Sequence, residues 1–160
     1  SVRFNMYTRH IISFDEHVKW WNVTKNRTDQ MYFMYEWDSI PAGIIGFTQI
    51  DMMNKNSSWA FYASPDAPKG TGIKMEYLAI EYAFGELRLN KLHCEVLDFN
   101  PAVVKLHEKF GFKVEGVLRE HHQIDHGFAN IFQLGLLKQE WVDQRVKMYE
   151  KLKRFSRGKS

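Results

Sequence analysis

The sequence predicts an α+β domain in which helices flank one mixed, mostly antiparallel central sheet. Residues 31–63 contain three runs of aromatic and branched residues separated by polar turns, which is the pattern of an antiparallel meander. Residues 70–87 have apolar residues at helical spacing, and residues 92–112 have the pattern of a strand, a helix and a re-entering strand. A strand followed by a helix and a strand implies a crossover connection, so the sheet cannot be purely antiparallel.

The composition is typical of one globular domain covering residues 1–160, with residues 137–160 as a C-terminal helix and basic tail. Hydrophobic residues make up 44% of the chain and the net charge is only +3, so we expect neither a nucleic-acid nor a membrane partner. Cys94 is the only cysteine, which excludes an internal disulfide and favours a reducing compartment, the cytoplasm. It lies on the apolar face of its strand, which predicts a buried structural thiol.

A helix is predicted near the start of the chain. Ser13-Phe14-Asp15-Glu16 has the form of a capping box, and Phe14, Val18 and Trp21 recur at helical spacing. His17 follows the box, either as an exposed first-turn residue or as a hydrogen-bonding partner of a substrate.

The remaining elements follow from periodicity and turn residues. We expect strands at 31–37, 44–51 and 59–63, with turns at 38–43 and 54–58, then a helix from Gly70 to Leu87, a strand at 91–97, a helix at 101–110, strands at 113–123 and 130–137, and a final helix from residue 138. The apolar stripe of that final helix is predicted to contain Trp141, Val142, Val146 and Tyr149. This helix would lie on the domain or on a second copy in a homodimer.

A glycine-rich segment precedes the long helix and predicts a phosphate site. Lys69-Gly70-Thr71-Gly72-Ile73-Lys74 places two glycines at a helix N-terminus, where free N–H groups and the helix dipole favour an anion. The two lysines add positive charge. An ordinary glycine-containing loop is the alternative.

Two stretches together resemble the GNAT superfamily of N-acetyltransferases. The first runs from Trp59 to Lys74, and the second is the helix that follows Asn100 and ends in Gly111-Phe112. The resemblance implies a splayed strand pair that forms a cleft for acetyl-CoA as cosubstrate, without a metal. It assigns cofactor binding to Phe61, Tyr62, Ala63, Lys69, Gly70, Thr71, Gly72, Ile73, Lys74 and Asn100. The superfamily's Gln or Arg before the first glycine is replaced here by Ala67.

The same resemblance places His107 where many members carry a tyrosine that protonates the departing thiolate. A histidine exchanges protons near neutral pH and suits this role; a surface histidine is the alternative. Glu95 is the predicted general base, because a carboxylate in an apolar strand is costly unless it is paired or used. An ion pair with His93 or a lysine is the alternative. The amine is expected to attack the thioester directly.

A finer resemblance, over residues 2–7, 12–17, 46–51 and 114–118 and at Tyr62 and Glu95, is to the subfamily that acetylates the 4-amino group of a UDP-linked 4-amino-4,6-dideoxy sugar in pseudaminic acid biosynthesis. It implies a small-molecule amine acceptor bound by His17, Thr48, Gln49 and Tyr62. It also implies that the chain begins after the family's first strand. An acetyltransferase of protein N-termini or polyamines, and a non-catalytic coenzyme A-binding module, remain alternatives. His121, His122, Asp125 and His126 are interpreted as exposed hairpin residues rather than metal ligands.

Overall fold

The computed structural model describes residues 16–21 and 28–157, with the backbone alone for 16–21 and 155–157. Seven strands within these ranges form one sheet in the order β1-β2-β3-β4-β5-β7-β6. The parallel pair β4/β5 lies in the middle, and each other neighbouring pair is antiparallel. The strands are β1 (Glu16–Trp21), β2 (Met31–Trp37), β3 (Ile40–Asp51), β4 (Asn56–Ala63), β5 (Lys91–Leu97), β6 (Lys113–Ile124) and β7 (Gly127–Leu137). The predicted α+β class is therefore confirmed.

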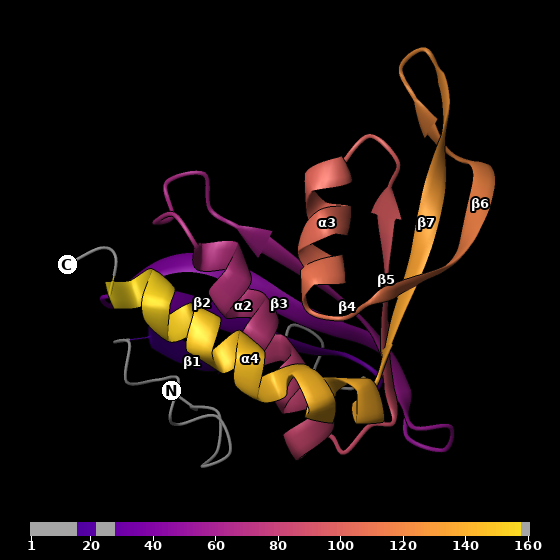
Figure 1. Cartoon of the computed structure of the whole chain (residues 1–160). Helices are drawn as coiled ribbons and strands as arrows, with labels where there is room; N and C mark the ends of the chain where they lie inside the picture. Colours follow the sequence, from indigo (N-terminus) through magenta and orange to yellow (C-terminus); the bar gives the residue numbers. More distant parts are fainter. Residues whose placement is uncertain (1–15, 22–27, 158–160) are drawn as a thin grey trace.

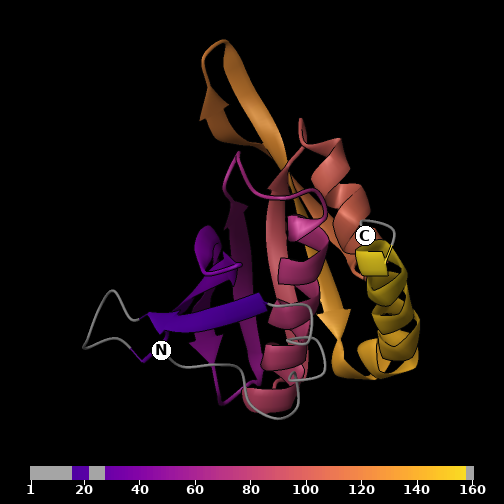
Figure 2. The same ribbon diagram turned by 90° about the vertical axis from the view of Figure 1, so that its left-hand side faces the viewer.

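Three helices cover one face of this sheet, as Figures 1 and 2 show from two sides. They are α2 (Thr71–Glu81), which continues into a π-helical turn, η1 (Tyr82–Glu86), then α3 (Pro101–Lys109) and α4 (Lys138–Arg157). Helix α4 lies across α2, and the β6–β7 hairpin extends beyond the rest of the molecule (Figure 1). None of the helices in the described part of the chain is long and apolar enough to cross a membrane.

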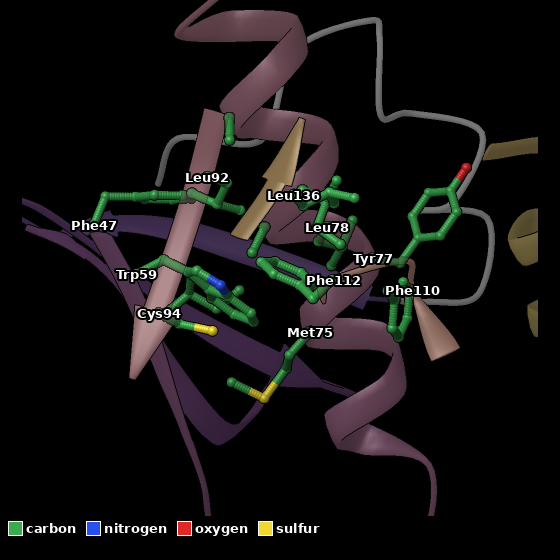
Figure 3. Packing of buried hydrophobic residues seen from close by; sticks show 14 of the residues in the cluster. Phe47, Trp59, Met75, Tyr77, Leu78, Leu92, Cys94, Phe110, Phe112 and Leu136 are labelled. Atoms are coloured by element: carbon green, nitrogen blue, oxygen red, sulfur yellow. The ribbon is translucent and has the colours of Figure 1, made fainter. Parts of the chain in front are cut away.

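The core lies between the sheet and these helices. Figure 3 shows Trp59, Leu92 and Cys94 of the two central strands against Met75 and Leu78 of α2. The most deeply buried large side chains are Trp59, Trp141, Tyr35, Tyr77, Phe47 and Phe110. Cys94 is 4% exposed, so its predicted burial is confirmed.

The predicted helix at the start of the chain is wrong within the described residues. Residues 16–21 form strand β1, which pairs antiparallel with β2 from Glu16↔Trp37 to Trp21↔Tyr32. Val18 and Trp21 are β-branched and aromatic residues, which favour strands, and a short window allows both periods. Ser13, Phe14 and Asp15 of the proposed capping box lie outside the described residues.

The turn between β2 and β3 is shorter than predicted. It consists of Asp38 and Ser39, both with left-handed backbones (φ 49° and 65°), as in two-residue hairpin turns that match strand twist. Pro41 therefore belongs to β3, opposite Glu36 and beside a register shift. A proline fits there because a bulge relaxes the hydrogen-bond ladder that its missing N–H would break.

The last helix was predicted correctly, but part of its stripe was not. Trp141 is fully buried, whereas Val142 and Val146 are 52% and 68% exposed. The buried stripe continues instead through Met148 and Leu152, which are 4% and 0% exposed. These two residues follow Trp141 by seven and eleven positions, which is the spacing of one helix face.

Candidate active site

The central parallel strand pair separates after three residues. Strands β4 and β5 pair at Asn56↔Lys91, Ser57↔Leu92 and Ser58↔His93 only. Beyond that point β4 stays paired with β3 as far as Ala63↔Gly43, and β5 stays paired with β7 as far as Leu97↔Ile131. The facing backbone edges from Trp59 to Ala63 and from Cys94 to Leu97 therefore diverge, so the predicted splayed strand pair is confirmed.

A cleft of about 330 Å³ opens between the diverging edges. Its walls are residues 59–63 of β4, residues 94–97 of β5 and one face of α3. That face carries Asn100, Val103 and His107, which are spaced by three and four residues and so lie on one side of the helix. Because β4 has lost its neighbour here, its backbone N–H and C=O groups on this side are available to a ligand.

The N-terminus of α2 has no side-chain cap. Gly70 occupies the N-cap position with a left-handed backbone (φ 90°) and no side-chain hydrogen bond, while Thr71 Oγ1 donates to the Pro68 carbonyl at 2.5 Å. The first N–H groups of a helix lack intrahelical acceptors, so those of Gly72 and Ile73 remain for an anion. The phosphate site itself stays a prediction.

The two lysines of this segment differ in position. Lys69 is exposed beside Gly70. Lys74 is 3% exposed, and its ammonium lies 3.9 Å from the centroid of the Trp37 ring on β2, a cation–π contact. The ammonium of Lys74 is therefore directed at the sheet and away from the predicted phosphate site.

Asn100 occupies the N-cap position of α3 as predicted, with Pro101 in the first turn. Its carbonyl accepts hydrogen bonds from the Val103 and Val104 N–H groups at 3.1 and 3.3 Å. Its side chain makes no capping hydrogen bond and is exposed at the cleft. The amide of Asn100 is therefore free of the structural role that an N-cap asparagine usually has.

His107 is not a surface histidine. It is 3% exposed, lines the cleft, and is surrounded by the rings of Trp59, Phe61 and Phe112 at centroid distances of 5.5, 6.3 and 5.4 Å. Its Nδ1 lies 2.8 Å from Oε2 of Glu76 on α2. Burial raises the pKa of Glu76, and the contact with His107 opposes that rise.

The side chain of Glu95 lies on the face of the sheet opposite the helices. The argument that predicted it as the general base, a costly carboxylate within an apolar strand, is wrong. Glu95 is exposed rather than buried in an apolar strand, because the face opposite the helices is open there. Its Oε2 is 3.5 Å from Gln133 Nε2. The alternative ion pair with His93 is not found; His93 Nε2 lies 3.3 Å from Asn56 Oδ1.

A second, polar hollow of about 410 Å³ lies beside Glu95. Its lining is rich in amide, hydroxyl, carboxyl and imidazole groups, from Gln49, Asn56, Ser58, His93, Glu95, Glu115 and Gln133 among others. Lys91 Nζ and Glu115 Oε1 are 2.7 Å apart within it. Burial and Lys91 lower the pKa of His93. Cys94 and Glu95 line both this hollow and the cleft, so the two spaces share a wall where β4 leaves β5.

The predicted acceptor residues are only partly brought together. Gln49 has a left-handed backbone (φ 53°) at the β3 irregularity and lines the polar hollow. Thr48 is half-buried and its carbonyl accepts a hydrogen bond from Ser57. Tyr62 is 67% exposed; strand alternation places its side chain opposite that of Phe61, which packs on α3.

His17 is separated from these residues by its place in the sheet. Strand β1 is an edge strand, and β2 and β3 lie between it and β4. Three strand spacings of about 4.8 Å put its backbone roughly 14 Å from the cleft strand.

Sequence reasoning missed Glu76 and the open-face residues Asn56, Ser58 and Glu115, and it considered His93 only as an ion-pair partner of Glu95. Glu76 could have been noticed as a charged residue next to the stripe of α2. The open-face residues alternate with buried ones along their strands, but no local signal shows which strand edges face each other. The predicted hairpin histidines His121 and His122 are exposed on β6, and among the described side chains no group of three His, Cys, Asp or Glu residues gathers as a metal site.

A mixed sheet that opens between two central parallel strands, beside an uncapped helix N-terminus, is the architecture of acyltransferases that use an acyl-CoA. The chain belongs to the acetyltransferase (GNAT) domain family, whose model matches residues 2–113.

Similar proteins include acetyltransferases of different description. The spermidine N(1)-acetyltransferase of Escherichia coli K12 is 26% identical over 111 residues, which are 69% of this chain and 60% of that protein. Acetyltransferase PseH of Campylobacter jejuni strain 81-176 is 28% identical over 109 residues, 68% of this chain and 67% of that protein. The chain thus spans about three fifths of the E. coli relative.

Solved structures share the fold. The spermidine N-acetyltransferase from Vibrio cholerae in complex with CoA and spermine aligns with a TM-score of 0.69 at 23% identity, over 72% of this chain and 69% of that chain. At this identity the likeness extends to the fold alone.

Proposed function

We propose that the chain is an acetyl-CoA-dependent N-acetyltransferase of a small-molecule amine. The observation that carries this proposal is the separation of β4 from β5 beyond Ser58 and His93, which opens a cleft between an uncapped helix and His107. Acetyl-CoA would supply an activated acetyl group in that cleft. The residues present fit such a molecule, because they offer free amides, a free strand edge and an uncommitted Asn100 side chain along one path.

The chain's own groups have distinct roles in this proposal. The N–H groups of Gly72 and Ile73 bind the diphosphate, with Lys69 as the nearby exposed cation and Lys74 acting on Trp37 instead. The free edge from Phe61 to Ala63 holds the pantetheine arm, and its N–H groups polarise the thioester carbonyl. Donors fixed in such positions are typically worth about 10²- to 10³-fold in rate.

We assign proton transfer to two residues, His107 in the cleft and Glu95 at the polar hollow. His107 protonates the departing sulfur through the ring nitrogen that Glu76 does not engage. Glu95 faces the polar hollow and takes the proton of the attacking amine, directly or through water. Direct attack follows because Cys94, the nucleophile within the cleft walls, is buried and its pKa is raised by that burial, which keeps it as an unreactive thiol.

For the acceptor we propose the 4-amino group of a UDP-linked 4-amino-4,6-dideoxy sugar. The hollow beside Glu95 supports this choice, since amide and hydroxyl groups such as those of Gln49, Asn56 and Ser58 suit the hydroxyls of a sugar. Tyr62 offers an exposed ring on the same face, and Thr48 borders Gln49. His17 joins this set only if the acceptor extends across β2 and β3.

A polyamine is the second candidate. The carboxylates of Glu95 and Glu115 in the hollow favour a cationic acceptor, and relatives with spermidine acetyltransferase descriptions match at similar identity to acetyltransferase PseH. Peptide N-termini are a third candidate.

The experiment measures release of free thiol from acetyl-CoA with a panel containing UDP-4-amino-4,6-dideoxy sugars, spermidine and peptides. Turnover with the sugar nucleotides supports the full proposal, and turnover with spermidine alone supports the second candidate. Binding of acetyl-CoA without turnover on any amine would reduce the chain to a coenzyme A-binding module. A His107→Phe variant should lose about 10²-fold in kcat while it keeps its affinity for acetyl-CoA.

A further inference from the structure

Glu76 is a buried carboxylate that the fold alone does not explain. It lies in the middle of α2 with 0% exposure, and it contacts His107 across the interface between α2 and α3 at 2.8 Å. Its other oxygen, Oε1, has no hydrogen-bond partner among the described residues. Replacing such a buried pair by apolar side chains is often neutral or stabilising, so stability gives no reason for it.

The surroundings of the pair decide which protons it holds. Aromatic rings of Trp59, Phe61 and Phe112 pack around the imidazole, so a net charge there is costly. A neutral pair exists in two forms, carboxylate with imidazolium or carboxylic acid with neutral imidazole. In both forms the proton between Oε2 and Nδ1 is shared within the pair, and Nε2 carries a proton of its own.

We propose that Glu76 is the positioning residue of His107. Glu76 fixes the imidazole through Nδ1 and keeps a proton on Nε2, which His107 gives to the departing sulfur. Nε2 is the ring nitrogen left for a ligand, because Nδ1 is engaged on α2 and His107 lines the cleft. Glu76 touches no ligand itself; it acts through His107. This inference rests on the proposed acetyl transfer.

The proton balance of the step is closed. A C–N bond forms to the amine and the C–S bond breaks, so one proton leaves nitrogen and one must reach sulfur. His107 gives its Nε2 proton to sulfur, and the pair is left with a net charge of −1. The unfavourable burial of that charge draws a proton back from solvent, which returns the pair to its neutral form.

Other titratable groups near the pair are few. Cys94 and Glu95 of β5 line the same cleft, and on α2 the ammonium of Lys74 lies over Trp37. The thiol pKa of Cys94 is raised by burial and by Glu76, so it stays neutral. Glu95 is exposed to solvent. Within the described residues, Glu76 is therefore the group with the most direct effect on His107.

The test compares Glu76→Gln with Glu81→Gln. Glutamine has the shape of glutamate and keeps a hydrogen bond to Nδ1 but cannot carry the shared proton. Glu81 is a second fully buried carboxylate on α2, bonded to Trp141 and Arg145 instead, so its variant controls for removing a buried charge. Thermal melting of both variants verifies that they are folded.

The first readout is independent of activity. The ring nitrogens of His107 are followed by ¹⁵N NMR as a function of pH, with the signal among the seven histidines assigned through a His107→Gln variant. In the wild type Nδ1 should give the signal of a nitrogen hydrogen-bonded to a carboxyl group, and Nε2 that of a protonated nitrogen; Glu76→Gln should change these signals, whereas Glu81→Gln should leave them as in the wild type. Identical ¹⁵N signals of His107 in wild type, Glu76→Gln and Glu81→Gln would overturn the inference.

The second readout is kcat with the best amine acceptor. Glu76→Gln should lower kcat about 10-fold or more, with the KM for acetyl-CoA unchanged. In a His107→Phe background Glu76→Gln should have no further effect on kcat, and an equal additional loss there would contradict action through His107. If no amine is acetylated by the wild type, the proposed function fails, while the NMR titration still decides the role of Glu76.

Discussion

Replacing Gly70 by aspartate is predicted to weaken acetyl-CoA binding much more than replacing it by asparagine. Gly70 is the N-cap of α2 with φ 90°, a backbone that Asn and Asp tolerate better than other non-glycine residues. The two substitutions therefore impose about the same backbone strain and the same side-chain volume. They differ in one negative charge placed beside the amides that we assign to the diphosphate.

The size of the effect follows from Coulomb's law. A carboxylate about 5 Å from one phosphate charge, at an effective dielectric constant of roughly 20 to 40 near a protein surface, repels it by about 1.5 to 3 kcal/mol. That energy corresponds to roughly 10- to 150-fold in Kd. The difference should shrink as salt is raised, because exposed charges are screened over about 8 to 10 Å.

The assay is isothermal titration of acetyl-CoA into wild type, Gly70→Asp and Gly70→Asn at low and high salt. Equal Kd values for the two variants, with melting temperatures that show both to be folded, would refute the phosphate assignment. A difference that does not depend on salt would refute its electrostatic basis.

Three further predictions concern stability, and the first also concerns acetyl-CoA binding. Asn100→Ala should lower the free energy of unfolding by well under the ~1 kcal/mol of a lost N-cap, since the Asn100 side chain makes no capping hydrogen bond. The same variant should weaken acetyl-CoA binding. A loss of ~1 kcal/mol in urea unfolding with an unchanged Kd for acetyl-CoA would show that Asn100 stabilises the helix and does not bind the cofactor. Arg145→Met should destabilise the fold by about 1 to 3 kcal/mol, because it removes the cationic partner of the buried Glu81 carboxylate. Lys113→Met at the exposed Lys113–Glu140 pair should cost less than ~1 kcal/mol. Equal losses in the two variants would argue against the Glu81 contact. Burial raises the pKa of Glu76 above 4.5. Between pH 4.5 and that raised pKa the native state therefore binds more protons than the unfolded state, so the free energy of unfolding falls as pH increases. Urea unfolding of Glu76→Gln should show a shallower dependence of this free energy on pH, and an unchanged slope would contradict the assignment.

Local patterns were sufficient for most of the fold. Gly70 and Gly111 mark helix ends, and in the structure both have positive φ angles, 90° and 104°. The apolar residues at helical spacing in residues 70–87 correctly predicted α2, although the last turn, η1, is π-helical. Residues 16–21 were misassigned because their strand depends on pairing with β2, a contact that no local window contains.

The candidate site was predictable only where one segment supplies several of its groups. The α2 N-terminus and the α3 face with Asn100 and His107 are contiguous in sequence, so they could be identified. The pair between His107 and Glu76 joins residues 31 positions apart, and the hollow beside Glu95 draws on five strands. Such groups meet through sheet order and crossover, which leave no signal in the residues themselves.

The central claim is that the gap between β4 and β5 holds the acetyl donor with its diphosphate on the N-terminus of α2. A crystal structure of the chain with coenzyme A tests it most directly. The account predicts diphosphate oxygens within hydrogen-bonding distance of the Gly72 and Ile73 N–H groups, and the thiol between the edges of β4 and β5 beside His107. Coenzyme A bound elsewhere, with these amides bonded to water, would contradict it.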